Sequence, residues 1–137
     1  MKKYLFFLLP ALTLALLTTL ASCEKDEGKL PNIDFKTGAT YTSSDITVAK
    51  NEPVLIGIQA SKAEDKDVLK SLNESVSFDG AAATSLESTT LSGTDGDNFS
   101  KDYLIVTRNQ AGTEKYTFTV TNRDGLTNSV SVTLTVQ

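Results

Sequence analysis

The feature that most restricts the fold is a strict alternation of apolar and hydroxyl-bearing residues near the C-terminus. Four aliphatic residues alternate there with four hydroxyl residues: Val130, Val132, Leu134 and Val136 with Ser129, Ser131, Thr133 and Thr135. A second run has the same period: Tyr116, Phe118 and Val120 alternate with Thr117, Thr119 and Thr121. Successive side chains of a strand point to opposite faces. Each run therefore predicts a strand with one face in the core and the other in water.

The four residues between these runs, Asn122-Arg123-Asp124-Gly125, contain an Asp-Gly pair. Glycine readily adopts the positive φ that a tight turn requires, and Asp-Gly is a frequent hairpin turn. We therefore predict that residues 116–136 form a β-hairpin that turns at Gly125.

Shorter β-type segments recur at intervals of about ten residues through the rest of the chain. They are residues 32–35, 41–48, 54–60, 76–78, 85–91 and 103–107. No window has convincing helical spacing, and residues 62–72 come nearest to it. The pattern predicts an all-β fold, a single antiparallel β-sandwich of seven or eight strands over residues 31–137.

Cysteine and histidine usage limits the chemistry that the chain can carry out. It has one Cys and no His, so it cannot form an internal disulfide, a Cys–His or Ser–His nucleophilic pair, or a His-containing metal cluster. Two of the 13 basic residues lie among the first 22, which leaves 11 basic against 17 acidic residues and a net charge of −6. An acidic chain without a basic stripe argues against a nucleic-acid partner. We expect no enzyme activity and no cofactor.

The first 22 residues have the order of a secretory signal peptide. Lys2 and Lys3 precede an apolar stretch from Tyr4 to Leu20, and small residues follow it. The alternative is a membrane-spanning helix, which needs about 20 apolar residues. The 17 residues of this stretch include a proline, and the flank that follows is acidic, so we favour a cleaved signal.

The run Leu20-Ala21-Ser22-Cys23 resembles the bacterial lipobox. The resemblance implies that Cys23 receives a diacylglyceryl group, that the chain is cut before it, and that the lipid anchors the protein to a membrane. Residues 23–30 would then form a flexible tether. Within it, Lys25, Asp26 and Glu27 resemble the export signal of Bacteroidetes surface lipoproteins, which implies an outer-membrane protein exposed on the cell surface. A simple polar tether on a periplasmic protein is the alternative.

The stretch from Glu114 to Val130 resembles the last two strands of PKD-type and cadherin-type immunoglobulin-like domains. Those families favour an acidic residue at the position of Asn122. The asparagine therefore weakens the inference of a calcium site at this position. The resemblance implies that Tyr116 is a tyrosine corner, with its hydroxyl bonded to upstream backbone. Phe118 takes the place of the second disulfide Cys and is expected to pack against Ile56 or Ile58. The opening segment, residues 33–38, also resembles small immunoglobulin-like lipoproteins of Bacteroidetes.

Few residues are candidates for a ligand site. Asp95 and Asp97, with Asp102 nearby, could offer oxygen ligands to Ca²⁺. Phe99 and the lack of a closing Glu depart from an EF-hand loop, so we predict an Asx-rich turn and no metal site. Of the tyrosines, Tyr41 lies in a polar neighbourhood and is a candidate platform for a ligand, whereas Tyr103 is expected in the core. The mixed charges of residues 62–67 indicate a solvated loop.

These observations predict a membrane-anchored, non-catalytic binding module, such as an adhesion or surface-assembly component, for a protein or glycan partner. The alternatives are a glycan-binding accessory of a polysaccharide-uptake system and a periplasmic inhibitor or envelope-structural lipoprotein. A small hydrolase comes last. Glycoside hydrolysis needs two carboxylates held in a cleft, and a domain of this size has little room for cleft-forming insertions.

Overall fold

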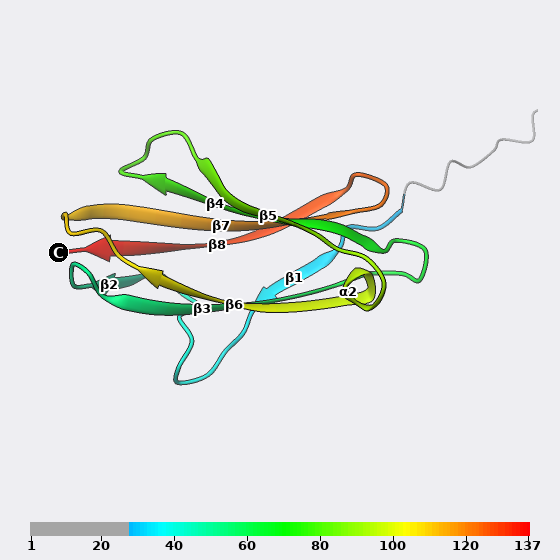
Figure 1. The fold of residues 1–137 in the computed structure, drawn as a ribbon, viewed down its shortest axis with the longest axis horizontal. Helices are drawn as coiled ribbons and strands as arrows, with labels where there is room; N and C mark the ends of the chain where they lie inside the picture. The colour runs from blue at the N-terminus through cyan, green and yellow to red at the C-terminus, as the bar shows by residue number, and fades with distance from the viewer. Residues whose placement is uncertain (1–27) are drawn as a thin grey trace, which may run out of the picture.

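Two β-sheets make up the computed structural model, which describes residues 28–137. Sheet A has the order β1-β3-β6, with β1 (Asn32–Phe35), β3 (Pro53–Ser61) and β6 (Asn98–Val106). Sheet B has the order β2-β8-β7-β4-β5, with β2 (Ile46–Val48), β4 (Leu69–Phe78), β5 (Thr84–Thr90), β7 (Gly112–Asn122) and β8 (Thr127–Val136). Figure 1 shows the sheets as two layers. The predicted all-β class is confirmed.

Several predicted features lie outside the described residues: the signal peptide of residues 1–22, Cys23, and the export signal of Lys25, Asp26 and Glu27. Between residues 28 and 137, one short helix, α2 (Thr94–Asp97), connects β5 to β6. No helix in that range has the length and apolar character that crossing a bilayer would require.

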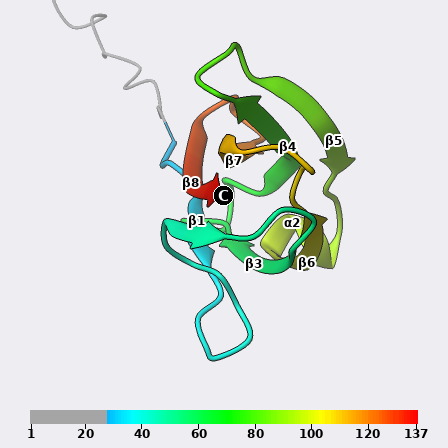
Figure 2. The same ribbon diagram turned by 90° about the vertical axis from the view of Figure 1, so that its left-hand side faces the viewer.

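Sheet B is mixed because β2 pairs with β8 in parallel, with Ile46 opposite Leu134 and Val48 opposite Val136. The other strand pairs of residues 28–137 are antiparallel. After β1 the chain leaves sheet A, forms the projecting loop of Figure 2, and joins sheet B at β2. In Figure 1 β1, β2 and β8 all point toward the end that holds the C-terminus, so β2 meets β8 in parallel. The prediction of a wholly antiparallel domain is therefore wrong at this pair.

The C-terminal hairpin joins β7 to β8, with Tyr116 opposite Val132 and Thr121 opposite Thr127. Gly125 has a φ of 84°, in the left-handed region that favours glycine. The Asn122 side chain also shapes the turn, since its Oδ1 accepts hydrogen bonds from the backbone N–H groups of Asp124 (3.0 Å) and Leu126 (2.9 Å). Asparagine side chains commonly bond local backbone in this way.

The core lies between the two sheets, and Phe118 of β7 has no exposed surface there. Its ring centroid lies 4.8 Å from that of Tyr103 in β6 and 6.4 Å from that of Phe35 in β1, which meets it edge-on. Ile56 and Ile58 of β3 are equally buried in the same cluster. Aromatic and aliphatic packing across the sheets thus occupies the region where the resemblance would place a disulfide.

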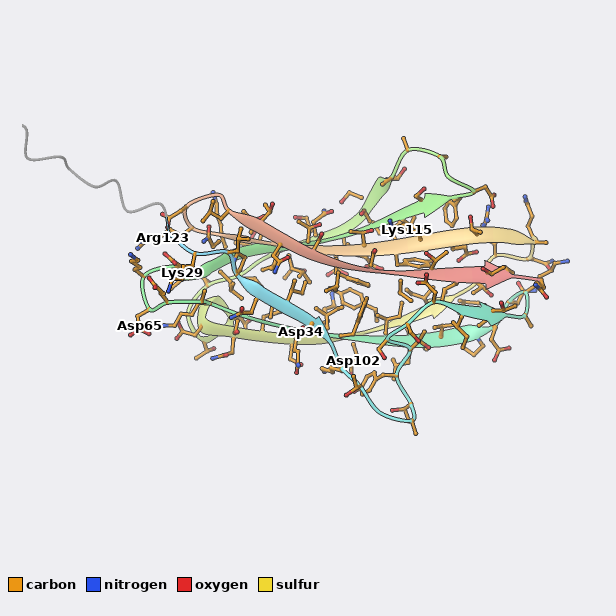
Figure 3. The ribbon with its side chains drawn as sticks, turned by 180° about the vertical axis from the view of Figure 1, so that it is seen from behind. Lys29, Asp34, Asp65, Asp102, Lys115 and Arg123 are labelled. Carbon is orange, nitrogen blue, oxygen red and sulfur yellow. The ribbon has the colours of Figure 1, made fainter. Side chains whose placement is uncertain are left out.

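The chain enters the domain at the end where β7 turns into β8, and its first residues are bound there (Figure 3). The backbone N–H of Lys29 donates to Asp67 Oδ2 (2.8 Å), and the Lys29 carbonyl accepts from Asn122 Nδ2 (2.9 Å). The Pro31 carbonyl accepts from Asn128 Nδ2 (3.0 Å). Asp67 has no exposed surface, so the prediction of a solvated loop over residues 62–67 is wrong at this residue.

Candidate functional site

The outer face of sheet A carries two rows of polar side chains. Residues that alternate with the buried positions of β1, β3 and β6 point away from the core, as the period of a strand requires. The first row runs Asn32–Ser61–Asn98, and the second runs Asp34–Gln59–Ser100. Three strands that are distant in sequence therefore bring six hydrogen-bonding side chains together.

These two rows line a shallow groove of about 350 Å³, whose wall also includes parts of Ala60 and Phe99. Within the rows, Asn32 Nδ2 donates to Ser61 Oγ (3.3 Å). We call this site the sheet A groove. No local sequence motif marks this groove, although the alternation in each strand shows which residues point outward.

A third row, next to the groove, is built around Gly57 and Asp102, which are opposite each other in β3 and β6. Lys36 Nζ contacts Asp102 Oδ1 at 2.7 Å, and the Tyr41 hydroxyl donates to Asp102 Oδ2 at 3.1 Å. The hydrogen bond from Lys36 holds the pKa of Asp102 below its usual value and the pKa of Lys36 above its own. Figure 3 shows Asp34 and Asp102 on the same layer.

Gly57 makes this arrangement possible because it has no side chain. A Cβ atom at this position would lie 2.7 Å from both Tyr41 Cε1 and Lys36 Cδ, which cover the glycine. We expect Gly57→Ala to displace both side chains from Asp102 and to lower the free energy of unfolding by about 1–2 kcal/mol, a usual cost of overpacking. Thermal unfolding measures this loss.

The matched control is the same substitution in a protein that also carries Lys36→Gly and Tyr41→Ala, because the Cβ of residue 36 would itself lie 2.8 Å from the added methyl group. In that background Gly57→Ala has no side chain to displace, and its cost should fall below about 0.5 kcal/mol. An equal cost in both backgrounds would show that Lys36 and Tyr41 do not pack on Gly57.

Beyond this third row, the outer face of sheet A becomes apolar. Leu55 is opposite Leu104, and Pro53 is opposite Val106. Leu104 is 71% exposed and Val106 is 60% exposed. Large apolar side chains exposed together on an edge strand are typical of a surface that contacts a partner. The same sheet face therefore presents a polar half near the entering chain and an apolar half beyond it.

The three aspartates considered for calcium are not brought around one point. Asp95 and Asp97 are in α2, and Asp97 Oδ1 contacts Lys62 Nζ at 2.8 Å. Asp102 is in the middle of β6 and is paired with Lys36. Within residues 28–137, no group of three acidic, Cys or His side chains is placed to hold a metal ion. The predicted turn at Asp95 is one turn of helix.

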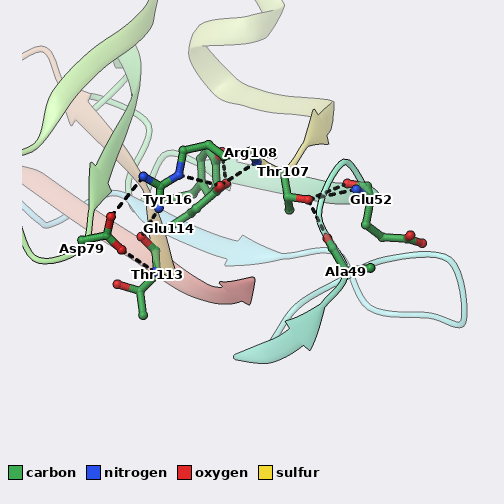
Figure 4. A network of polar contacts seen from close by, with 8 residues as sticks. All are labelled: Ala49, Glu52, Asp79, Thr107, Arg108, Thr113, Glu114 and Tyr116. Carbon is green, nitrogen blue, oxygen red and sulfur yellow. Dashed lines mark hydrogen bonds and ion pairs between the residues drawn. The ribbon is translucent and has the colours of Figure 1, made fainter. Parts of the chain in front are cut away.

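Tyr116 does not make the backbone hydrogen bond that its resemblance to a tyrosine corner implies. Its hydroxyl donates to Glu114 Oε2 (2.9 Å), and Glu114 Oε1 accepts from the backbone N–H (2.8 Å) and Nε (3.0 Å) of Arg108. The buried Glu114 carboxylate thus connects Tyr116 to the loop before β7 through hydrogen bonds on both of its oxygens (Figure 4). Burial, followed by the hydrogen bond to Glu114, raises the pKa of Tyr116.

Arg108 extends this network to the turn after β4. Its Nη1 contacts Asp79 Oδ2 at 3.1 Å, and Asp79 Oδ1 accepts from the backbone N–H of Thr113 at 2.7 Å. The guanidinium also lies 4.4 Å from the ring centroid of Phe78. On the other side of the loop, Thr107 Oγ1 donates to the carbonyl of Ala49 at 2.8 Å. The network holds loops together, and we assign it a structural role.

A second charged cluster closes the side of the domain between β5 and β6. Lys101 of β6 forms an ion pair with Glu87 of β5 and lies 4.8 Å from the Tyr103 ring centroid. Glu74 of β4, opposite Glu87, is only 7% exposed. Burial, followed by the nearby Glu87 carboxylate, raises the pKa of Glu74. Inward-pointing charges on edge strands are a common protection against strand addition.

No family model and no curated protein matches the chain. Among solved structures, the superoxide reductase (neelaredoxin) from Ignicoccus hospitalis is 8% identical, with a TM-score of 0.51, over 80% of this chain and 81% of that one. A β-glucosidase from Listeria innocua in complex with gluconolactone is 9% identical, with a TM-score of 0.41, over 77% of this chain and 16% of that one. The first likeness shows the fold alone, and the second is too weak to support an argument.

Proposed function

We propose that the protein is an exported lipoprotein whose immunoglobulin-like sandwich binds a partner through the outer face of sheet A without catalysing a reaction. The observation that carries this proposal is the composition of that face. One face of sheet A carries six polar side chains and the exposed Leu104 and Val106. Tyr41, from the loop after β1, contacts Asp102 on the same face. Such a mixture of apolar anchors and hydrogen-bonding groups is typical of recognition surfaces.

The strand order supports the immunoglobulin-like assignment. The order β8-β7-β4 in one sheet, facing β1-β3-β6 in the other, corresponds to strands G-F-C and A-B-E of that sandwich. β5 lies beside β4, where variable-type domains place strand C′. The short strand β2 pairs in parallel with β8, the strand that corresponds to G. These correspondences support the resemblance that the stretch from Glu114 to Val130 suggests, although Tyr116 bonds Glu114 instead of backbone.

The distribution of charge supports a binding role over a catalytic one. Glu114 is committed to Arg108 and Tyr116, and Asp102 to Lys36 and Tyr41. A glycosidase of the usual kind needs two carboxylates facing one substrate, one of them protonated. Asp34 is the single carboxylate that lines the sheet A groove. The groove is therefore better suited to hold a ligand than to cleave it.

The anchor is tested by Cys23→Ala. We expect this variant to lose the lipid and to move almost entirely from the membrane fraction to the soluble fraction, because stable attachment of such a protein depends on its acyl chains. Cell fractionation and the intact mass of the mature protein measure the change. Unchanged membrane retention together with unchanged mass would overturn the lipoprotein proposal.

Exposure on the cell surface is tested by protease treatment of intact cells. The domain should be digested in the natural protein and protected when Lys25, Asp26 and Glu27 are all replaced by alanine. Full protection of the natural protein would instead support the periplasmic alternative, an inhibitor or an envelope-structural lipoprotein.

A further inference from the structure

We propose that the sheet A groove is a binding site for a neutral saccharide. This inference rests on the proposed function and deepens it by naming the ligand class. The carrying observation is that six polar side chains form a two-by-three grid across β1, β3 and β6: Asn32, Ser61 and Asn98 in one row, and Asp34, Gln59 and Ser100 in the next.

The hydrogen-bonding groups of the grid match those of a sugar. The amides of Asn32, Asn98 and Gln59 each offer donors and an acceptor, and Ser61 and Ser100 each offer a hydroxyl that does both. The hydroxyls of a saccharide are likewise donors and acceptors. Asp34 adds a carboxylate, which accepts hydrogen bonds from hydroxyls more strongly than a neutral group does.

The side chains of the grid are free to bind a ligand. Apart from the contact between Asn32 and Ser61, the grid side chains make no hydrogen bond to any other part of residues 28–137. Asp34, Gln59, Asn98 and Ser100 are exposed. A ligand would therefore exchange hydrogen bonds with water for hydrogen bonds with these groups, without breaking an internal network.

The charge of the groove favours a neutral ligand over an anionic one. No Lys or Arg lines it, and Asp34 is its only charged group. The neighbouring cations are themselves paired: Lys36, in the third row, contacts Asp102 at 2.7 Å, and Lys62, which follows Ser61, contacts Asp97 at 2.8 Å. Phosphate, sulfate and carboxylate groups are normally bound by free cations or clustered backbone N–H groups. The charge of Asp34 would therefore repel the anionic group of a uronic acid or a phosphorylated ligand.

The dimensions of the groove fit one or two sugar rings. Residues two apart along a strand are separated by about 7 Å and neighbouring strands by about 4.8 Å, so the grid covers roughly 10 Å by 7 Å. Its volume of about 350 Å³ is at the small end of ligand sites. Lys36 and Tyr41, packed over Gly57, form a wall beside the second row. Because this wall blocks the direction along the strands, a saccharide of more than two rings would run across the strands.

The test is calorimetric titration of the full-length protein in a detergent without a sugar headgroup. The probes are cellohexaose, maltohexaose, laminarihexaose, mannohexaose and xylohexaose, with hexagalacturonate as the anionic comparison. We expect at least one neutral hexasaccharide to bind at millimolar concentration and hexagalacturonate to bind more weakly. Asp34→Ala and Gln59→Ala should each weaken binding about tenfold, since each removes hydrogen bonds to the ligand.

Gln110→Ala is the matched control, because it removes an exposed amide from the loop between β6 and β7, away from the groove. It should leave the affinity unchanged. The inference is overturned if no neutral hexasaccharide binds, if hexagalacturonate binds best, or if Asp34→Ala and Gln59→Ala bind as the natural protein does. Chromatography of the saccharide after incubation distinguishes a failure of the non-catalytic function from a failure of the saccharide site. If the saccharide is bound and cleaved, the non-catalytic function is overturned and the saccharide site is retained.

Discussion

Replacing Glu114 with leucine is expected to lower the free energy of unfolding by about 3 kcal/mol. The substitution removes the acceptor for the Tyr116 hydroxyl and for the backbone N–H and Nε of Arg108. Breaking a buried ion pair by deleting one partner costs about 3–5 kcal/mol, and we take the lower end because the Arg108 side chain is 26% exposed and can reach water. For a domain of this size, the loss corresponds to a fall in Tm of about 12 °C.

Two further variants provide reference values for the loss of stability in Glu114→Leu. Lys115→Ala alters the next residue of β7, which points to water, and should change stability by less than about 0.5 kcal/mol. Tyr116→Phe removes one hydroxyl and should cost about 1 kcal/mol. Calorimetric unfolding of the three variants measures the series. A Glu114→Leu protein as stable as Lys115→Ala would show that the carboxylate does not hold the loop before β7.

Phe118→Ala is expected to cost about 3–5 kcal/mol, the usual range when a fully buried phenylalanine is truncated. The cavity would lie between the sheets, where Phe118 meets Tyr103 and Phe35. Those rings belong to strands fixed by hydrogen bonds, so the core can collapse only partly around the missing side chain. Urea unfolding should show a lower midpoint with an unchanged dependence on denaturant.

Phe118→Leu is the control, because it retains most of the apolar volume and should cost about 1.5 kcal/mol or less. A loss below about 1 kcal/mol for Phe118→Ala would contradict the placement of this ring between the sheets. A changed dependence on urea would indicate that the variant no longer unfolds in one step.

The parts of the fold that can be predicted from the sequence are those that depend only on patterns among neighbouring residues. The hairpin of β7 and β8 follows from alternation and an Asp-Gly turn, and β1 was expected over residues 32–35, where the structure has it. The segment 62–72 shows the limit of such patterns. Its partly helical spacing arises because a loop that buries Asp67 runs into β4, where Leu69 and Leu72 face the core.

The candidate site could not be predicted in the same way, because it depends on register between distant strands. Nothing local indicates that Asp34 lies beside Gln59, or Gln59 beside Ser100. Asp102 illustrates the point. Its sequence neighbours suggest a calcium ligand, yet its partner is Lys36, 66 residues away. The parallel partner of β2 likewise depends on how the chain crosses between the sheets.

If Cys23 carries the proposed lipid, the contacts of Lys29 would limit the distance between the domain and the membrane. With Lys29 held by Asp67 and Asn122, at most residues 23–28 would connect a lipid on Cys23 to the folded part. Six residues have a contour length of about 20 Å at most. A bulky partner would be kept away from the polar rows near this end by the headgroup layer. A single glycan chain is narrow enough to enter the space between the domain and the headgroups. The short connecting segment would therefore favour narrow ligands over bulky ones.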